Sequence, residues 1–234
     1  MRINMGNRKI ILFTIVMPLL LSACSFGGDR DVHASNVSRK AEFNSVDVTG
    51  ANFAKELSLR SVRTGNMVHL SDYLGKVLIV YFGFTGCQSE CPVAMSEWKA
   101  VFHALGKDSS QLQLLFVTVD PERDSPSVLK KYITSFGESN FDALYGSLPE
   151  IHKVAKEFHI YFDSMPMRKK ELTNTNHRMM SHNNHNMMVM PRTIDHTAVS
   201  YVYDKKLGLR LLVKNGQIAP DKIIGDIRKI LAGL

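Results

Sequence analysis

Cysteine is scarce in this chain, with three residues among 234. Cys24 lies near the N-terminus, so the remainder of the chain has only Cys87 and Cys91. Two cysteines are too few for a disulfide scaffold, and too few for a structural zinc site that depends on four ligands. A pair four residues apart can instead bind a soft metal ion, exchange electrons as dithiol and disulfide, or do both.

The N-terminus lacks an apolar run long enough for a comfortable membrane span, because the run at residues 10–21 has only 12 residues. Basic residues precede it, and Leu-Ser-Ala-Cys24 ends it, which resembles a bacterial lipoprotein cleavage box. We therefore expect a signal peptide over 1–23 and a diacylglycerol on Cys24. The alternative is an uncleaved signal anchor followed by an unmodified cysteine.

Export follows from the lipoprotein interpretation. We expect the folded domain on the extracytoplasmic (periplasmic) side of the cell membrane, held by the lipid. That compartment is oxidising, so Cys87 and Cys91 can form a disulfide unless a periplasmic or extracellular thiol reductant keeps them reduced.

No block of basic residues is present, although the formal net charge is +7. Arg2, Arg8 and Lys9 supply three of these charges, and the rest are spread along the chain. This pattern excludes a nucleic-acid partner. The modest excess either helps the domain rest on anionic lipids or has no functional significance.

Alternating strands and helices predict an α/β fold. We expect a polar flexible tether over 24–50 and a folded domain over 51–234. The domain begins with a hairpin (57–62 and 68–70), and a buried strand (77–82) runs through a glycine-containing turn into two thiols and a helix. That order narrows the class to a thioredoxin-like three-layer fold. The other expected elements are helix 93–105 with Pro92 at its first position, strand 112–119, helix 126–136, strand 141–146, helix 148–159, strands 195–204 and 209–213, and helix 220–234.

The segment 165–190 has neither a helical nor a strand period and holds seven of the twelve methionines. We predict a long loop insertion there. Thioether and imidazole groups suit auxiliary copper capture, and the alternative is a functionally silent loop. The candidate ligands are His177, His182, His185, Met179, Met180, Met187 and Met188.

The dithiol lies at the start of a predicted helix, where thiolates are stabilised. Thiolates select soft ions such as Cu(I), and two thiolates rarely complete a site. His196, at the start of a late strand, is the best third ligand, because that strand enters a thioredoxin-like fold opposite the dithiol. The alternative is a strand-end surface histidine. His69, His103, His152 and His159 are expected to be surface or packing residues.

Three motifs in the same order resemble the Sco/SenC family: Gly83-Phe84-Thr85-x-Cys87-x-x-x-Cys91-Pro92, the run 117–126 containing Asp120-Pro121-Glu122-Arg123-Asp124, and Asp195-His196-Thr197-Ala198. These are thioredoxin-fold copper proteins that assist assembly of the copper-A centre of cytochrome c oxidase. The resemblance covers about 50–234 and implies that Cys87, Cys91 and His196 bind copper, as Cu(I), Cu(II) or both.

The acidic run has two interpretations. In the first, its carboxylates position the metal loop or dock a partner. In the second, the run is structural, with Asp124 or Ser125 capping the next helix and Arg123 pairing locally. The chain also departs from the family pattern, with Gly86 where histidine is common and Gln88 where proline is common. Glu90 places a negative charge between the thiols, and these changes leave open the balance between copper delivery and thiol reduction.

Two functions therefore follow. The first is a metallochaperone, not an enzyme, whose partners are the copper-A subunit of cytochrome c oxidase and another copper chaperone. The second is a thiol–disulfide oxidoreductase acting on exported client cysteines, with Cys87 as nucleophile and Cys91 as resolving thiol. A peroxidase is disfavoured, because peroxiredoxin nucleophiles have no second cysteine four residues on.

Overall fold

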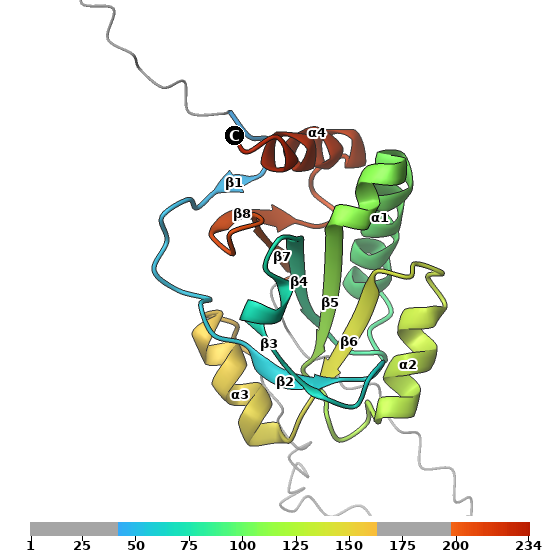
Figure 1. Cartoon of the computed structure of the whole chain (residues 1–234). Coiled ribbons are helices and arrows are strands. Elements are labelled where there is room, and N and C mark those ends of the chain that lie inside the picture. Colours follow the sequence, from blue (N-terminus) through green and yellow to red (C-terminus); the bar gives the residue numbers. More distant parts are fainter. Residues whose placement is uncertain (1–41, 163–197) are drawn as a thin grey trace, which may run out of the picture. The chain divides into compact units, whose positions relative to one another are not determined.

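Strand β4 (Val77–Gly83) forms the centre of an eight-stranded sheet, and all seven of its residues are buried. The computed structural model describes residues 42–162 and 198–234 (Figure 1). The strand order is β1-β8-β7-β4-β5-β6-β2-β3. The other strands are β1 (Val46–Asp47), β2 (Ser58–Ser61), β3 (Met67–His69), β5 (Leu112–Thr118), β6 (Phe141–Tyr145), β7 (Val199–Tyr203) and β8 (Leu209–Lys214).

Parallel pairing joins β4 to β5 and β5 to β6, and helices connect these strands. Helix α1 (Glu90–Leu105) follows β4, and helix α2 (Pro126–Thr134) follows β5. On its other edge β4 pairs antiparallel with β7, in a register that sets Tyr81 opposite Ser200. The carboxyl end of β4 therefore lies beside the beginning of β7.

Successive residues of β4 face opposite sides of the sheet, and each side is covered by helices. Tyr81 contacts Phe116, which packs against Tyr132 of α2. Phe82 packs on the other face against Phe158, just after helix α3 (Leu148–Glu157). Figure 1 shows α3 apart from α1 and α2, with helix α4 (Pro220–Leu231) next to α1. The predicted three-layer α/β fold with an N-terminal hairpin, here β2 and β3, is confirmed.

The predicted tether over 24–50 is too long at its C-terminal end. The backbone N–H groups of Asn44 and Ser45 donate to the buried Asp226 carboxylate at 3.0 and 2.8 Å. Val46 and Asp47 then pair with β8 as the short strand β1. Two residues are too few to show a strand period, so the polar composition of the segment predicted a tether and the pairing with β8 was not predicted. Residues 24–41 lie outside the described ranges.

All four helices differ from the sequence prediction at one end; α2 and α4 end at Thr134 and Leu231, before the predicted 136 and 234. Helix α1 begins at Glu90, so Pro92 is its third residue and not its first. Proline is tolerated there because the first N–H groups of a helix have no partner within the helix. The helix predicted over 148–159 ends at Glu157, and His159 has a positive φ of 54°. Within the described ranges, no helix has the length and apolar character required to cross a membrane.

Candidate functional site

The two cysteines lie where β4 ends and α1 begins. The cysteine loop, residues 84–89, leaves the end of β4 and carries Cys87, while Cys91 is the second residue of α1. Both thiols are reduced and buried, Cys87 with 8% of its surface exposed and Cys91 with none. An entering reactant or metal ion therefore meets Cys87 first.

Because Gly83 has no side chain, the Cys91 side chain can pack against the end of β4. A Cβ atom on Gly83 would lie 2.7 Å from the Cys91 sulfur and 2.9 Å from the Phe116 ring. Cβ atoms do not approach other atoms so closely in real structures, so the end of β4 must be glycine for the thiol to pack there.

The N-terminus of α1 is directed at the outer sulfur. The Cys91 backbone N–H donates to Cys87 Sγ at 3.4 Å, which uses one of the amide groups that a helix leaves without an internal partner. The Cys87 thiol in turn donates to Glu90 Oε2 at 3.7 Å. Glu90 thus lies against the outer thiol, in a first turn where a negative charge is favoured by the helix dipole.

Burial raises the pKa of the Cys91 thiol from 9.0 to about 12. A backbone hydrogen bond involving Phe84 and the neighbouring Tyr81 hydroxyl act in the opposite direction, and the adjacent Cys87 raises the pKa further. Cys91 is therefore a protonated thiol in the reduced protein at neutral pH. It becomes a good ligand or nucleophile only when its proton is displaced.

Two phenol groups border the thiols. Burial raises the pKa of Tyr81 and of Tyr132 far above the usual value, and the nearby cysteines add to both shifts. Neither hydroxyl has a regular hydrogen-bond partner among the described residues, although both oxygens are buried. The Tyr81 hydroxyl lies close enough to the Cys91 sulfur to lower the pKa of that thiol. Two buried donors beside two sulfurs suit a site where negative charge on sulfur must be stabilised.

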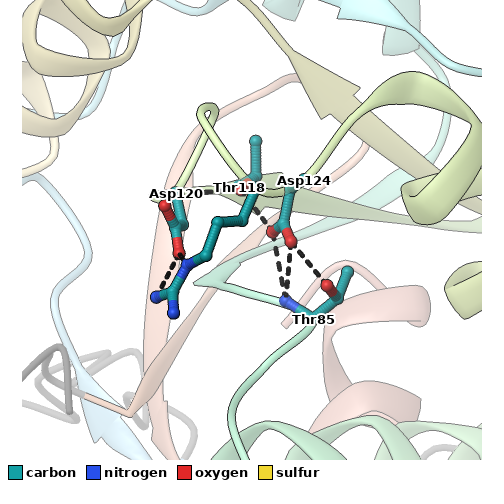
Figure 2. Close-up of polar contacts among 5 residues, drawn as sticks. Thr85, Thr118, Asp120 and Asp124 are labelled. Atoms are coloured by element: carbon teal, nitrogen blue, oxygen red, sulfur yellow. Dashed lines mark hydrogen bonds and ion pairs between the residues drawn. The ribbon is translucent and has the colours of Figure 1, made fainter. Parts of the chain in front are cut away.

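Asp124 connects the cysteine loop to the end of β5. Its carboxylate accepts hydrogen bonds from the Thr85 backbone N–H at 3.0 Å, from the Thr85 hydroxyl at 2.5 Å and from the Thr118 hydroxyl at 2.6 Å. Figure 2 shows the carboxylate between the two threonines. Burial raises the pKa of Asp124, while the threonine hydrogen bonds lower it.

The acidic run makes local contacts and also contacts the cysteine loop. Ser125 caps α2 by accepting from the Val128 N–H at 3.4 Å, and Arg123 pairs with Asp120 at 2.5 Å. These contacts confirm the local structural interpretation for Ser125 and Arg123. Asp124, however, does not cap α2: its carboxylate bonds the loop that carries Cys87.

A second set of buried polar groups joins α1 to β7. Trp98 Nε1 donates to Ser200 Oγ at 2.8 Å, and Ser200 Oγ donates to Asn215 Oδ1 at 2.6 Å. Asn215 Nδ2 then donates to Glu97 Oε2 at 3.0 Å. These contacts fix the helix that carries Cys91 against the start of β7.

Several predicted site residues lie outside the described ranges. Within 42–162 and 198–234, no group of three or more histidine, cysteine or acidic side chains is arranged to hold a metal ion. His69, His103, His152 and His159 are exposed; His152 stacks on Phe162 and His159 on Phe53, so they are surface and packing residues as predicted. The residues outside are Cys24, His196 and the candidate ligands of 165–190, namely His177, His182, His185, Met179, Met180, Met187 and Met188.

Comparison with known proteins identifies the family of this chain. The model of the SCO1/SenC family matches residues 49–232. The chain belongs to the SCO1/SenC family. Mitochondrial SCO1 of Saccharomyces cerevisiae is 38% identical over 103 residues, which is 44% of this chain and 35% of the yeast protein. The chain spans about a third of the length of the mitochondrial relatives that it matches.

Solved Sco structures share the fold. Bradyrhizobium japonicum ScoI with copper bound superposes with a TM-score of 0.60 at 26% identity, covering 76% of this chain and 99% of that one. BsSco, described as a member of the Sco family of cytochrome c oxidase assembly proteins, has a TM-score of 0.54 at 20% identity, covering 80% of this chain and 98% of that one. The thioredoxin-like class predicted from the sequence is confirmed.

The sequence prediction of this Sco site missed Tyr81, and it named the acidic run without the contacts that Asp124 makes. Tyr81 precedes the cysteine loop in an entirely apolar strand, so it reads as a core aromatic. Asp124 was within a recognised motif that also contains Thr118, but its other partner, Thr85, is 39 residues away in the sequence. Only the parallel register that sets Gly83 opposite Thr118 brings these threonines to one end of the sheet.

Proposed function

We propose that this Sco protein binds copper through Cys87, Cys91 and His196 and assists assembly of the copper-A centre of cytochrome c oxidase. The observation that carries the proposal is a pair of reduced, buried thiols at the end of β4, in a family whose Bradyrhizobium member has a copper-bound structure. Copper is here the cargo. Thiolate sulfur and imidazole nitrogen are the ligands that Cu(I) prefers, and a further ligand suits Cu(II).

The register of β7 supports His196 as the third ligand. Ser200 lies opposite Tyr81, so the chain enters β7 beside the end of β4, where the cysteine loop begins. His196 precedes Val199 by three residues, and three residues of extended chain reach at most about 11 Å. This short reach supports a proposal in which the imidazole binds the same metal ion as the two sulfurs. The segment 165–190 precedes it and would supply auxiliary thioether and imidazole ligands for copper capture.

The expected location also belongs to this proposal. A lipid on Cys24 would hold the domain at the extracytoplasmic face of the membrane, where the copper-A subunit of the oxidase, another copper chaperone and a thiol reductant are the expected partners. A SCO1/SenC family protein from Bacillus anthracis with a crystal structure is described as a lipoprotein, which supports such an anchor.

Titration of the reduced protein with Cu(I) under anaerobic conditions tests the copper site. We expect one tightly bound copper with sulfur and nitrogen neighbours in X-ray absorption, and retention of this copper after deletion of 165–190. His196→Ala should weaken binding at least about tenfold, because a two-sulfur site lacks its third donor. His103→Ala, at an exposed position on α1, is the matched control and should bind as the unmodified protein does.

Unchanged affinity in His196→Ala would contradict the three-ligand site. Absence of tight copper in the unmodified protein would favour the second function, a thiol–disulfide oxidoreductase. The unequal burial of the thiols is the observation that favours it. Cys87 sulfur would attack a client disulfide to form a mixed disulfide, and Cys91 would displace the reduced client, leaving a Cys87–Cys91 disulfide for the reductant to reduce.

A further inference from the structure

We propose that Asp124 is a positioning residue for the copper site, acting through Thr85 on the loop that carries Cys87. The inference deepens the proposed function and rests on it. Asp124 touches neither sulfur; it fixes the segment from which the outer sulfur extends.

The geometry of this contact is a bridge between two strand ends. Gly83 and Thr118 are the last residues of β4 and β5 and lie opposite each other in the parallel register. The backbone already joins the two ends there, since the Val119 N–H donates to the Gly83 carbonyl at 2.8 Å. Asp124 adds a second connection two residues further along, between the Thr118 hydroxyl and Thr85.

Asp124 is held firmly enough to act as a fixed support. Its side chain is 2% exposed, and its own backbone N–H donates to the Asp120 carbonyl at 2.9 Å. It takes both donors of Thr85, the amide and the hydroxyl. Thr85 is therefore fixed in position and orientation, and Cys87 follows after a single residue, Gly86. The Cys87 N–H in turn donates to the Phe84 carbonyl at 3.2 Å, which closes the loop on itself.

A loop fixed in this way brings Cys87 to Cys91 without further ordering. Closing a disulfide or binding copper requires both sulfurs in a defined arrangement, and any freedom of the loop must be lost at that moment. Releasing the loop should therefore weaken both processes together, by on the order of threefold to tenfold, the cost of ordering one or two further side chains.

The test uses two variants of the contact and one matched control. Asp124→Asn replaces one acceptor oxygen by a donor, and Thr85→Val removes the hydroxyl at nearly constant volume. The control is Asp142→Asn, because Asp142 is another buried carboxylate (6% exposed) that accepts from a hydroxyl, Ser61 Oγ at 2.6 Å, and from a backbone N–H. It lies on β6 and does not contact the cysteine loop.

Two quantities are measured on the full chain: the equilibrium constant for Cys87–Cys91 disulfide formation against glutathione without copper, and the Cu(I) dissociation constant. We expect Asp124→Asn and Thr85→Val to lower the first and raise the second, Thr85→Ser to restore both, and Asp142→Asn to change neither while losing comparable stability.

Equal shifts in Asp142→Asn would assign the effect to general loosening and overturn the proposal, as would unchanged values in Asp124→Asn. A shift in Asp124→Asn without one in Thr85→Val would show that Asp124 does not act through the Thr85 hydroxyl, and would also overturn it. If Asp124→Asn does not fold, Thr85→Val decides. If the unmodified protein binds no copper, the proposed function fails, while the glutathione equilibrium still tests the positioning role.

Discussion

The indole N–H of Trp98 donates to the hydroxyl of Ser200 at 2.8 Å, and both side chains are fully buried. This contact joins the helix that carries Cys91 to the strand that follows His196 in the chain. Helix α1 and strand β7 are thereby held together in the core. The hydrogen bond should therefore matter for the position of the helix that carries Cys91 as well as for stability.

Trp98→Phe should lower the free energy of unfolding by about 1–3 kcal/mol, because it leaves the buried Ser200 hydroxyl with one partner fewer and removes part of an aromatic ring. Ser200→Ala should also be destabilising, since it leaves the indole N–H buried without an acceptor. Urea unfolding of both variants and of the double variant measures their coupling. A double variant that loses the full sum of the two single losses would show that the contact contributes nothing of its own.

Gly83→Ala should disrupt the site, since the added Cβ would lie 2.7 Å from the Cys91 sulfur and 2.9 Å from the Phe116 ring. Overpacking of this kind costs about 1–3 kcal/mol, and displacement of Cys91 should also weaken copper binding. Gly86→Ala, three residues further on in the cysteine loop, is the matched control, because a Cβ atom there would have its nearest neighbours at 3.5 Å, an ordinary contact distance. Thermal unfolding and Cu(I) affinity should therefore separate the two variants, and equal losses would contradict the packing argument.

The pH dependence of the free energy of unfolding should reveal the burial of the Cys91 thiol. Folding raises the pKa of Cys91 from 9.0 to about 12, so above pH 9 the unfolded chain loses a proton that the folded chain keeps. The unfolded state then binds fewer protons, and this contribution to stability, fully present below pH 9, is lost as pH rises toward 12. The slope is at most about 1.4 kcal/mol per pH unit.

Urea unfolding of the reduced protein between pH 8 and 11 measures that slope. Cys91→Ala should be less stable below pH 9, because a buried group is removed, and its stability should fall less steeply above pH 9. Titrations that both proteins share cancel in the difference between the two slopes, which therefore reports on the thiol and its effect on neighbouring groups. Parallel curves would contradict the burial of a protonated Cys91.

The sequence predicts the part of this structure that depends on local patterns. The buried run of β4, the apolar face of α1 and the cysteine spacing are all visible within windows of a few residues, and each is confirmed. Contacts that depend on register are not visible in this way. Asp124 meets Thr85 across 39 residues, and Trp98 meets Ser200 across 102.

The sequence also fails to predict short elements, which have too few residues to show a hydrophobic period. Strand β1 has two residues and pairs with β8, and Asn44 just before it is bound by Asp226, 182 residues away, so polar composition alone predicts a tether there. Pro92 was predicted at the first position of α1 because proline is common there. The helix begins two residues earlier, which brings the Cys91 amide within reach of the Cys87 sulfur.

Tyr81→Phe should have opposite effects on stability and on the thiols. Among the described residues the Tyr81 hydroxyl has no regular hydrogen-bond partner, so its removal should leave the free energy of unfolding of the reduced protein unchanged or raise it by up to about 1 kcal/mol. Because this hydroxyl lowers the pKa of Cys91, its removal should raise that pKa further and slow alkylation of Cys91 at alkaline pH. It should also weaken Cu(I) binding, since copper displaces the thiol proton.

Tyr203→Phe is the matched control, because Tyr203 is equally buried on the neighbouring β7 and its hydroxyl donates to the Ala54 carbonyl at 2.6 Å. Loss of this hydrogen bond should cost about 1 kcal/mol, with no change in Cys91 alkylation or in copper affinity. The paired comparison separates a hydroxyl that supports the fold from one that supports the site. If Tyr81→Phe lost as much stability as Tyr203→Phe and reacted at the same rate as the unmodified protein, Tyr81 would be a core residue whose proximity to the sulfur has no chemical consequence.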